Sequence, residues 1–526
     1  MVSRIRPWWA PVLVACIGFI AARTAMLPGL AFWDTAELQA VGPLMGTAHP
    51  AGFPTYTLLG WLASVVLQPF GEPAFRMNLF AGLCLAFAAG LTVDLVRALT
   101  RSALVGMLAG IGLALTPVAW ALGTHAEAHA LHLAFVVVLL RLLVAWGARV
   151  RPGSPQPSSG PGADRFLVAA AVVFGLSVGN HSLTLLLALP VALFVLAVDR
   201  EIWRDRRLVA LCLGAFAAAV VLVYLELPLR AGPFRAALVY GRPETWDGFW
   251  YVALGEQFRT SLVDPFGDLP AKAGSLVARA VDQFGPLAPL VPLALVATLV
   301  RQPRYALLTV SAVAITCLFA ASYRNADIGR YYVGPVLMIW TWLAILVAAA
   351  GEWAGRLFKR ALGRAAMPTT DGALAGPWRV LAAVPAVVLV IVTLAPTGFS
   401  LSDRFDAVDE SKDRRATSWV DHALSVMEPG AVLVSWWSYS TPLWYAQRVE
   451  GRRPDLAIVD DRTRLDEGLG DITDVIDANL GTHPVYVIRD DSDEIALLAA
   501  RYELEFIDGR DARALTRVLG LRETGS

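Results

Sequence analysis

The stretch FWDTAE at positions 32–37, followed by HPAGFPTY at positions 49–56, comes directly after the first apolar run of the chain. It brings a tryptophan, two carboxylates, a histidine and several prolines close together. If the first part is helical, Asp34 and Glu37 share one face, because residues three positions apart lie above one another on a helix. The same pattern fits a solvated loop or an active site, and the rest of the chain decides between them.

The composition is that of a membrane protein. Of the 526 residues, 56% are hydrophobic and only 17% are charged, whereas a soluble domain is about 25% charged. Apolar runs of about 18 or more residues recur along the chain, which predicts a polytopic α-helical protein. All four cysteines fall inside apolar runs and are expected to serve packing. The first run has Arg4 and Arg6 before it and no cleavage signal after it, so we expect a retained anchor.

The distribution of Arg and Lys predicts the topology. Phe53–Phe70 is apolar but is interrupted by proline, and it either crosses the membrane or lies along its surface. If it lies along the surface, every later basic cluster falls on the side of Arg4 and Arg6, as the positive-inside rule requires. If it crosses, most clusters fall outside. We therefore expect about 11 spans, with the N-terminus cytoplasmic and the C-terminus outside.

Net charge divides the chain into two parts. Residues 401–526 carry 25 acidic and 15 basic side chains, so with zero net charge overall the first 400 residues carry +10. We expect residues 1–400 to form the transmembrane catalytic domain, with a first external loop at 28–73 and a second outer loop at 229–284. Residues 401–526 are expected to form a separate external domain. Aromatic residues between Trp246 and Phe258 predict an amphipathic helix at the membrane interface.

The C-terminal part reads as a small soluble domain. Short β-type runs at 431–436, 456–459 and 485–488 alternate with predicted helices at 474–480 and 494–502. This alternation is typical of a three-layer α/β domain with a parallel sheet. The domain lacks a GxGxxG motif, so nucleotide binding has no support.

Polar clusters recur where the predicted topology reaches the outer face. Ionisable residues at membrane depth are costly and are therefore functional candidates, although each alone also fits a hydrated loop or a helix cap. His125, Glu127 and His129 have a spacing that would put both histidines on one helix face, but the HExxH order of a zinc site is absent. No metal site is predicted. The clusters are Asp34, Glu37 and His49; His125, Glu127 and His129; Asn180 and His181; and Tyr323 to Arg330.

Several of these stretches resemble, in the same order, a family of multi-pass proteins long known only as an uncharacterised domain. The family is similar to the protein O-mannosyltransferases of the GT-C glycosyltransferase superfamily. At Ala128 and His129 this chain departs from the Val-Tyr of the family pattern. The matching stretches are Trp33–Glu37 with His49–Pro54, Ala126–His129, Gly175–His181, Asp327–Tyr332, and Thr441–Tyr445 with Gly451–Asp455.

The resemblance implies a function. Enzymes of this superfamily take a sugar, with mannose as one candidate, from a polyprenyl-phosphate lipid at the outer surface of the plasma (inner) membrane. The acceptor is a hydroxyl of a protein, lipid or glycan. By resemblance, Asp34 acts as general base with Glu37 beside it, the anomeric centre is inverted, and Arg330 faces the leaving phosphate, with Arg324 as second choice. The expected donor- and acceptor-binding residues are His49, Tyr56, Glu127, Asn180, His181, Asp327 and Arg330.

The sequence indicates no required cofactor, and the binding of a divalent cation stays open. Membrane lipids are expected partners, and nucleic acids are not. Two other functions remain as alternatives. A transporter or flippase of lipid-linked sugars would be favoured by an inverted repeat, and the sequence shows none. A non-catalytic envelope scaffold would be favoured by loss of the first-loop acids, which are present.

The topology yields a first prediction. A cysteine placed at position 204, in the basic run from Arg200 to Arg207, should be protected from membrane-impermeant reagents in sealed cells. A cysteine in the 401–526 domain should be labelled from outside. Labelling of position 204 from outside would refute the topology.

Overall fold

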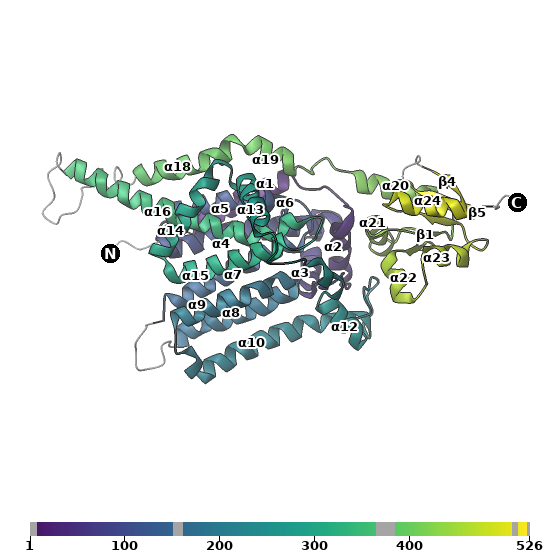
Figure 1. Ribbon diagram of the computed structural model, residues 1–526, viewed down its shortest axis with the longest axis horizontal. Coiled ribbons are helices and arrows are strands. Elements are labelled where there is room, and N and C mark those ends of the chain that lie inside the picture. Colours follow the sequence, from purple (N-terminus) through teal and green to yellow (C-terminus); the bar gives the residue numbers. More distant parts are fainter. Residues whose placement is uncertain (1–7, 151–160, 364–383, 508–513, 523–526) are drawn as a thin grey trace. The chain divides into compact units, whose positions relative to one another are not determined.

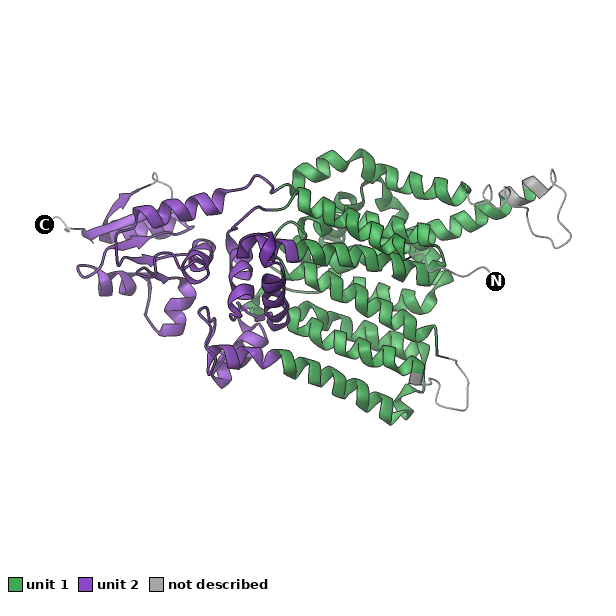
Figure 2. Cartoon of the chain, turned by 180° about the vertical axis from the view of Figure 1, so that it is seen from behind, with its two compact units in different colours: residues 1–26, 81–223, 258–409 green, residues 27–80, 224–257, 410–526 purple. Residues whose placement is uncertain are grey.

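The computed structural model describes residues 8–150, 161–363, 384–507 and 514–522. Contacts divide the chain into two compact units, shown in green and purple in Figure 2. The helical unit comprises Met1–Met26, Ala81–Val223 and Phe258–Asp409, and the sheet unit comprises Leu27–Phe80, Tyr224–Gln257 and Glu410–Ser526. Each unit is described by itself.

The helical unit is built from long apolar helices, several of which run roughly parallel in Figure 1. They are stable in hydrocarbon because a helix satisfies all of its own backbone hydrogen bonds. The helices are α1 (Trp9–Thr24), most of α4 (Pro73–Thr100), α5 (Ala103–Ala114), α6 (Pro117–Ala121), α7 (Ala128–Gly147), α8 (Pro161–Asn180), η2 (Ser182–Leu187), α9 (Ala188–Val198), α10 (Arg206–Tyr224), α13 (Leu269–Phe284), α14 (Val291–Arg301), α15 (Pro303–Ala321), η6 (Ile328–Tyr332), α16 (Val333–Gly363), α18 (Val384–Phe399) and α19 (Leu401–Val408).

The chain is a multi-pass membrane protein. Within the described residues, 7 helices are long and apolar enough to span a membrane, or 8 if the bent pair α18 and α19 forms one span. Three further apolar helices, Trp9–Thr24, Ala103–Ala114 and Ser182–Val198, are shorter than these candidates. The predicted count of about 11 is not confirmed by this test.

Helix α13 lies in the range 229–284 that the sequence predicted as the second outer loop. It carries Lys272, Arg279 and Asp282 between its apolar residues. It is the first part of an apolar helical segment, Leu269–Arg301, that is a candidate membrane span. The aromatic helix predicted before it is present as α12 (Trp246–Ala253).

The sheet unit begins with two short helices, α2 (Trp33–Leu44) and α3 (Pro54–Val66). The 13 residues of α3 span about 20 Å at 1.5 Å per residue, which is short for a hydrocarbon core of about 30 Å. This length fits the predicted surface position of the segment. The other helices are α11 (Glu226–Ala231), α20 (Arg415–Val426), α21 (Trp437–Arg448), α22 (Asp461–Glu467), α23 (Ile472–Asn479) and α24 (Ser492–Arg501).

The C-terminal residues form a five-stranded sheet of order β2-β1-β3-β5-β4. The three predicted strands are confirmed as the parallel strands β1 (Val432–Val434), β2 (Ala457–Val459) and β3 (Val485–Val487). The prediction of a wholly parallel sheet is wrong, because β4 (Tyr502–Phe506) and β5 (Thr516–Leu521) add two antiparallel pairings. Strand β4 follows α24 with no turn residue between them, so the helix predicted over 494–502 ran one residue into the strand.

Two hydrophobic cores lie on opposite faces of the sheet, which confirms three layers. One core joins Val432, Val434 and Val485 to α23 and α24. The other joins Leu433 and Tyr486 to α20 and α21. Alternate residues of a strand point to opposite faces, so one strand serves both cores.

The second of these cores also includes α2. Ala36 and Ala40 of α2 belong to the same buried cluster as Leu443, Tyr445 and Ala446 of α21. The loop at 28–73, which the sequence analysis predicted to be external and grouped with the spans, is therefore packed into the same compact unit as the C-terminal residues. This packing places the residues around Asp34 against the start of α21.

Candidate functional site

Helix α2 starts from a loop that is held by buried amides. The Gln39 side chain donates to the Gly29 carbonyl (3.0 Å) and to Asn78 Oδ1 (2.9 Å), and it accepts from the Ala31 amide (3.0 Å). Asn78 in turn donates to the Leu27 carbonyl (2.9 Å). Because these groups are buried, losing any partner would leave an unsatisfied polar atom. The network fixes the backbone that leads into Asp34.

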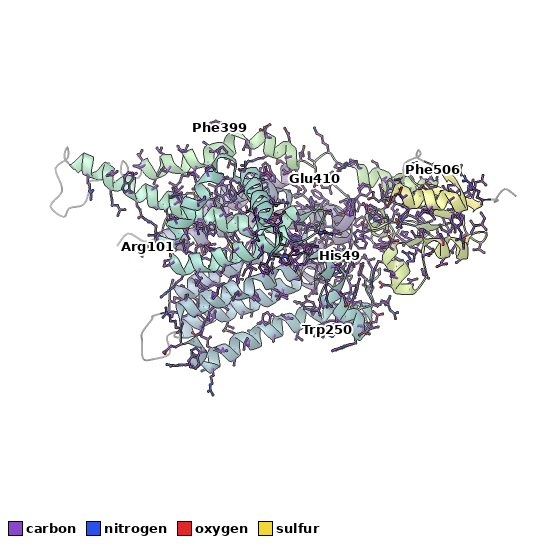
Figure 3. All side chains as sticks on the ribbon, in the orientation of Figure 1. His49, Arg101, Trp250, Phe399, Glu410 and Phe506 are labelled. Atoms are coloured by element: carbon purple, nitrogen blue, oxygen red, sulfur yellow. The ribbon has the colours of Figure 1, made fainter. Side chains whose placement is uncertain are left out.

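Glu37 and His49 form a buried pair. His49 Nδ1 lies 2.5 Å from Glu37 Oε2, and the His49 amide donates to Glu37 Oε1 at 2.8 Å. The Glu37 side chain is only 2% exposed. Burial raises the pKa of Glu37, while the imidazole and amide of His49 act to lower it. Both carboxylate oxygens of Glu37 are thus directed to His49, which is labelled in Figure 3.

Asp34 lies on the other side of the imidazole and is more open. Its Oδ2 is 4.0 Å from His49 Nε2, and its side chain is 28% exposed. Its Oδ1 accepts a hydrogen bond of 2.9 Å from the indole of Trp437, the first residue of α21. The helix N-cap is Phe32, so the interpretation of Asp34 as a cap is wrong. As predicted, Asp34 and Glu37 share a helix face, with His49 between them.

Aromatic residues enclose this group. Trp437 contacts the rings of His49, Tyr240 and Trp444 edge to face, each at 5.8 Å between centroids. The pKa of Tyr240 is raised by burial, and its hydroxyl donates to Gln257 at 2.8 Å. The loop before α3 packs closely on Val252 and requires glycine at position 52. The backbone φ there is +77°, and a Cβ would lie 2.8 Å from the Val252 side chain.

A second polar group lies in the helical unit. Arg330 Nη1 is 2.9 Å from Glu127 Oε2, and Glu127 Oε1 is 2.8 Å from His129 Nδ1. Burial alone would raise the pKa of Glu127, but the Arg330 guanidinium and the neighbouring His129 hold it well below its usual range. His181 packs on His129 at 4.4 Å between ring centroids, and Asn180 donates to the Ala128 carbonyl at 3.0 Å.

The other predicted residues take different positions. Asp327 is exposed and lies 3.8 Å from Arg330. Tyr56 is fully buried within α3, with its ring 5.9 Å from that of Phe80. The shared helix face expected for His125 and His129 is wrong, because α7 begins at Ala128 and its N-cap Glu127 is extended. Among the described residues, no group of three or more His, Cys, Asp or Glu side chains is arranged to hold a metal ion.

Sequence reasoning missed four residues of the first group: Gln39, Asn78, Tyr240 and Trp437. One signal was available for the last of these. The Trp-Trp pair at positions 436 and 437 lies at the end of the strand predicted over 431–436, and the ends of parallel strands form the edge that carries ligand sites in open α/β sheets. The two amides give no such signal, because only their burial distinguishes them.

The Glu37 and His49 pair yields a pH prediction. In His49→Gln, Glu37 loses the imidazole that lowers its pKa, so its folded pKa rises further above the unfolded value of 4.5. A carboxyl with a raised pKa stabilises the fold only while it is protonated, and this stability is lost as the pH rises from the unfolded through the folded pKa. We expect the Tm of His49→Gln to fall more steeply than that of wild type as pH rises above 4.5.

The matched control is the double variant Glu37→Gln/His49→Gln, which has no buried carboxyl at position 37 and should lose the extra slope. Differential scanning fluorimetry of the purified proteins over a pH series gives both values. Equal slopes for His49→Gln and wild type would show that the imidazole does not control Glu37.

The chain is similar to known proteins in both sequence and structure. Residues 34–204 match the family model described as the protein O-mannosyl-transferase TMEM260 N-terminal domain. The mouse (Mus musculus) Protein O-mannosyl-transferase TMEM260 is 31% identical over 265 residues, which are 48% of this chain and 36% of the mouse protein. The matched region thus spans about a third of the length of that relative.

Two solved structures are similar over nearly the whole chain. ArnT from Cupriavidus metallidurans, bound to undecaprenyl phosphate, has a TM-score of 0.55 at 17% identity and covers 97% of both chains. The oligosaccharyltransferase AglB from Archaeoglobus fulgidus, in complex with an inhibitory peptide and a dolichol-phosphate, has a TM-score of 0.54 at 13% identity, over 98% of this chain and 74% of AglB. At this identity the likeness establishes the fold. The chain therefore has the fold of ArnT and AglB, and over residues 34–204 it is similar to the protein O-mannosyl-transferase TMEM260 N-terminal domain.

Proposed function

We propose that the chain is a membrane glycosyltransferase that moves a sugar from a polyprenyl-phosphate lipid to a hydroxyl acceptor on the outer face. The observation that carries the proposal is the Asp34 carboxylate, which is partly exposed while its neighbours Glu37 and His49 are buried. The mouse relative is named an O-mannosyl-transferase, which supports mannose as the sugar and a protein as the acceptor. The undecaprenyl phosphate bound to ArnT supports the class of donor.

In the proposed reaction Asp34 acts as general base. It removes the proton of the acceptor hydroxyl while the hydroxyl oxygen attacks the anomeric carbon of the donor. The bond from that carbon to the phosphate oxygen breaks, and its electron pair leaves with the polyprenyl phosphate. One direct displacement inverts the anomeric centre, as in the inverting hydrolysis of glycosides. The step needs no covalent enzyme intermediate.

Glu37 and His49 are proposed to support Asp34, and because they are more deeply buried than Asp34 they are less accessible to the substrate. Because both oxygens of Glu37 are occupied by His49 groups, we assign Glu37 a positioning role and not a role in binding hydroxyls. The hydrogen bond at Nδ1 orients the imidazole so that Nε2 faces Asp34. His49 is then placed to interact with the proton that Asp34 has accepted.

Arg330 is proposed to stabilise the leaving phosphate, since a guanidinium binds phosphate oxygens through charge-assisted hydrogen bonds. Its side chain is 14% exposed and is paired with the more deeply buried Glu127. This pairing orients the guanidinium and also reduces its net charge. Asn180, His181 and Asp327, which lie on the adjoining segments, are proposed to contribute to binding of the donor.

Because Arg330 is paired with Glu127, a test of Arg330 must separate loss of donor binding from loss of this ion pair. Arg330→Ala should lower donor affinity and transfer strongly, and Arg330→Lys should restore only part of both. Removing one member of a buried ion pair also costs about 3–5 kcal/mol, so Tm must be measured alongside. The control Glu127→Gln/Arg330→Ala removes the orphaned carboxylate and should recover stability but not donor binding. Near-normal donor affinity and rate in Arg330→Ala would transfer the phosphate role to Arg324.

Asp34→Asn tests the proposed function most simply. Asn retains the size of the side chain and can still accept the bond from Trp437, but it cannot accept the proton. We expect a folded protein with normal donor binding and transfer lowered by about 10²–10⁴-fold, the range for loss of a general base. Glu37→Gln should have a milder effect. Activity of Asp34→Asn within a few-fold of wild type would contradict the assignment.

A further inference from the structure

The bond between Asp34 and Trp437 joins residues that are 403 positions apart in the chain. The indole Nε1 donates to Asp34 Oδ1 at 2.9 Å, whereas Asp34 Oδ2 is the oxygen that faces His49. The two oxygens of the proposed base therefore have different surroundings. One is held by a neutral donor, and the other lies on the side of the imidazole.

The position of Trp437 at the edge of the sheet explains why its indole N–H is well placed to reach Asp34. It is the first residue of α21 and follows β1, the middle of the three parallel strands. In the order β2-β1-β3, the chain passes from β1 to β2 on one side and then crosses from β2 to β3 on the other side of β1, so the loop after β1 lies at a topological switch point. The helix that starts there packs directly on α2.

The indole has little freedom to move. His49, Tyr240 and Trp444 surround it edge to face. The residues just before Asp34 are anchored to the same helix start: Trp33 contacts Trp436 at 4.6 Å between centroids, and Phe32 contacts Tyr439 at 5.5 Å. Trp33 also has a left-handed backbone (φ 61°), which is costly for a bulky residue and persists only where its surroundings impose it.

We propose that Trp437 is a positioning residue for Asp34 and that the C-terminal domain is thereby part of the catalytic machinery. The indole fixes Oδ1, so that Oδ2 is the oxygen that accepts the proton of the acceptor. This inference rests on the proposed function, in which Asp34 is the base. It assigns to the external domain a role in the rate of the chemical step, distinct from binding of donor or acceptor.

The role predicts a specific kinetic pattern. A hydrogen bond to a carboxylate favours its charged form, so Trp437→Phe should shift the acid limb of the pH profile of kcat to higher pH. The lost bond to a charged group should lower kcat by about 10- to 100-fold, with KM for the donor nearly unchanged. A merely structural role would lower Tm or raise KM without moving the pH profile.

The experiment uses the full chain in nanodiscs with radiolabelled polyprenyl-phosphate mannose and a serine- and threonine-containing peptide. Trp437→Phe, Asp34→Asn and the double variant form a cycle. If Trp437 acts through Asp34, its effect disappears in the Asp34→Asn background. Trp342→Phe is the matched control, because it removes an indole hydrogen bond of the same length, 2.9 Å to Thr309 Oγ1 in the helical unit, and should leave kcat and the pH profile unchanged.

A second measurement does not depend on transfer. Infrared difference spectra over a pH series, with Asp34→Asn as the blank, follow protonation of the Asp34 carboxyl. Trp437→Phe should let that carboxyl keep its proton to higher pH, and Trp342→Phe should not. If Trp437→Phe does not fold, benzothienylalanine at position 437 keeps the bicyclic ring and replaces only the N–H by sulfur.

The outcomes separate the two claims. Absence of transfer by the wild type refutes the proposed function, while a shifted carboxyl titration in the same samples still establishes the hydrogen bond as a control on Asp34. Equal effects of Trp437→Phe in both Asp34 backgrounds, or an unshifted titration, overturn the positioning role.

Discussion

The structure around Asp34 depends on one buried contact, the packing of α2 on α21. Helix α2 has only 12 residues and contains Gly42 and Pro43, so its own propensity cannot hold it in place, and tertiary packing must do so. Ala36 and Ala40 provide that packing within the core that also covers one face of the sheet. The helix that carries the proposed base is packed in the same compact unit as the C-terminal sheet.

The two carboxylates of α2 show how environment separates chemical roles. Glu37 is buried and occupied by His49, whereas Asp34 keeps an exposed edge. Two acids one helical turn apart thereby differ in exposure, and burial raises the pKa of Glu37; such differences in environment are the general means by which one site holds carboxylates with different roles. Burial has the opposite outcome for Glu127 in the helical unit. The positive charge of Arg330 lowers the pKa of this buried carboxylate and keeps it ionised.

The features that were predictable from the sequence are local. Asp34 and Glu37 are three positions apart, and helical periodicity alone gives them one face. Runs of β-branched residues gave strands β1 to β3. The error in the sheet arose where a local pattern has two solutions, because β4 alternates Glu with apolar residues directly after a helix. The bond from Trp437 to Asp34 could not be predicted, because it crosses 403 residues and depends on how the sheet edge meets α2.

The central claim is that this fold transfers a sugar and does not merely move a lipid across the membrane. Sealed proteoliposomes that contain the purified chain and labelled polyprenyl-phosphate mannose, with a hydroxyl-bearing peptide outside, test it directly. The account predicts that the label leaves the lipid, enters the peptide and shows an inverted anomeric configuration relative to the donor. Label that stays on the lipid and only changes leaflet would contradict the account and establish a flippase instead.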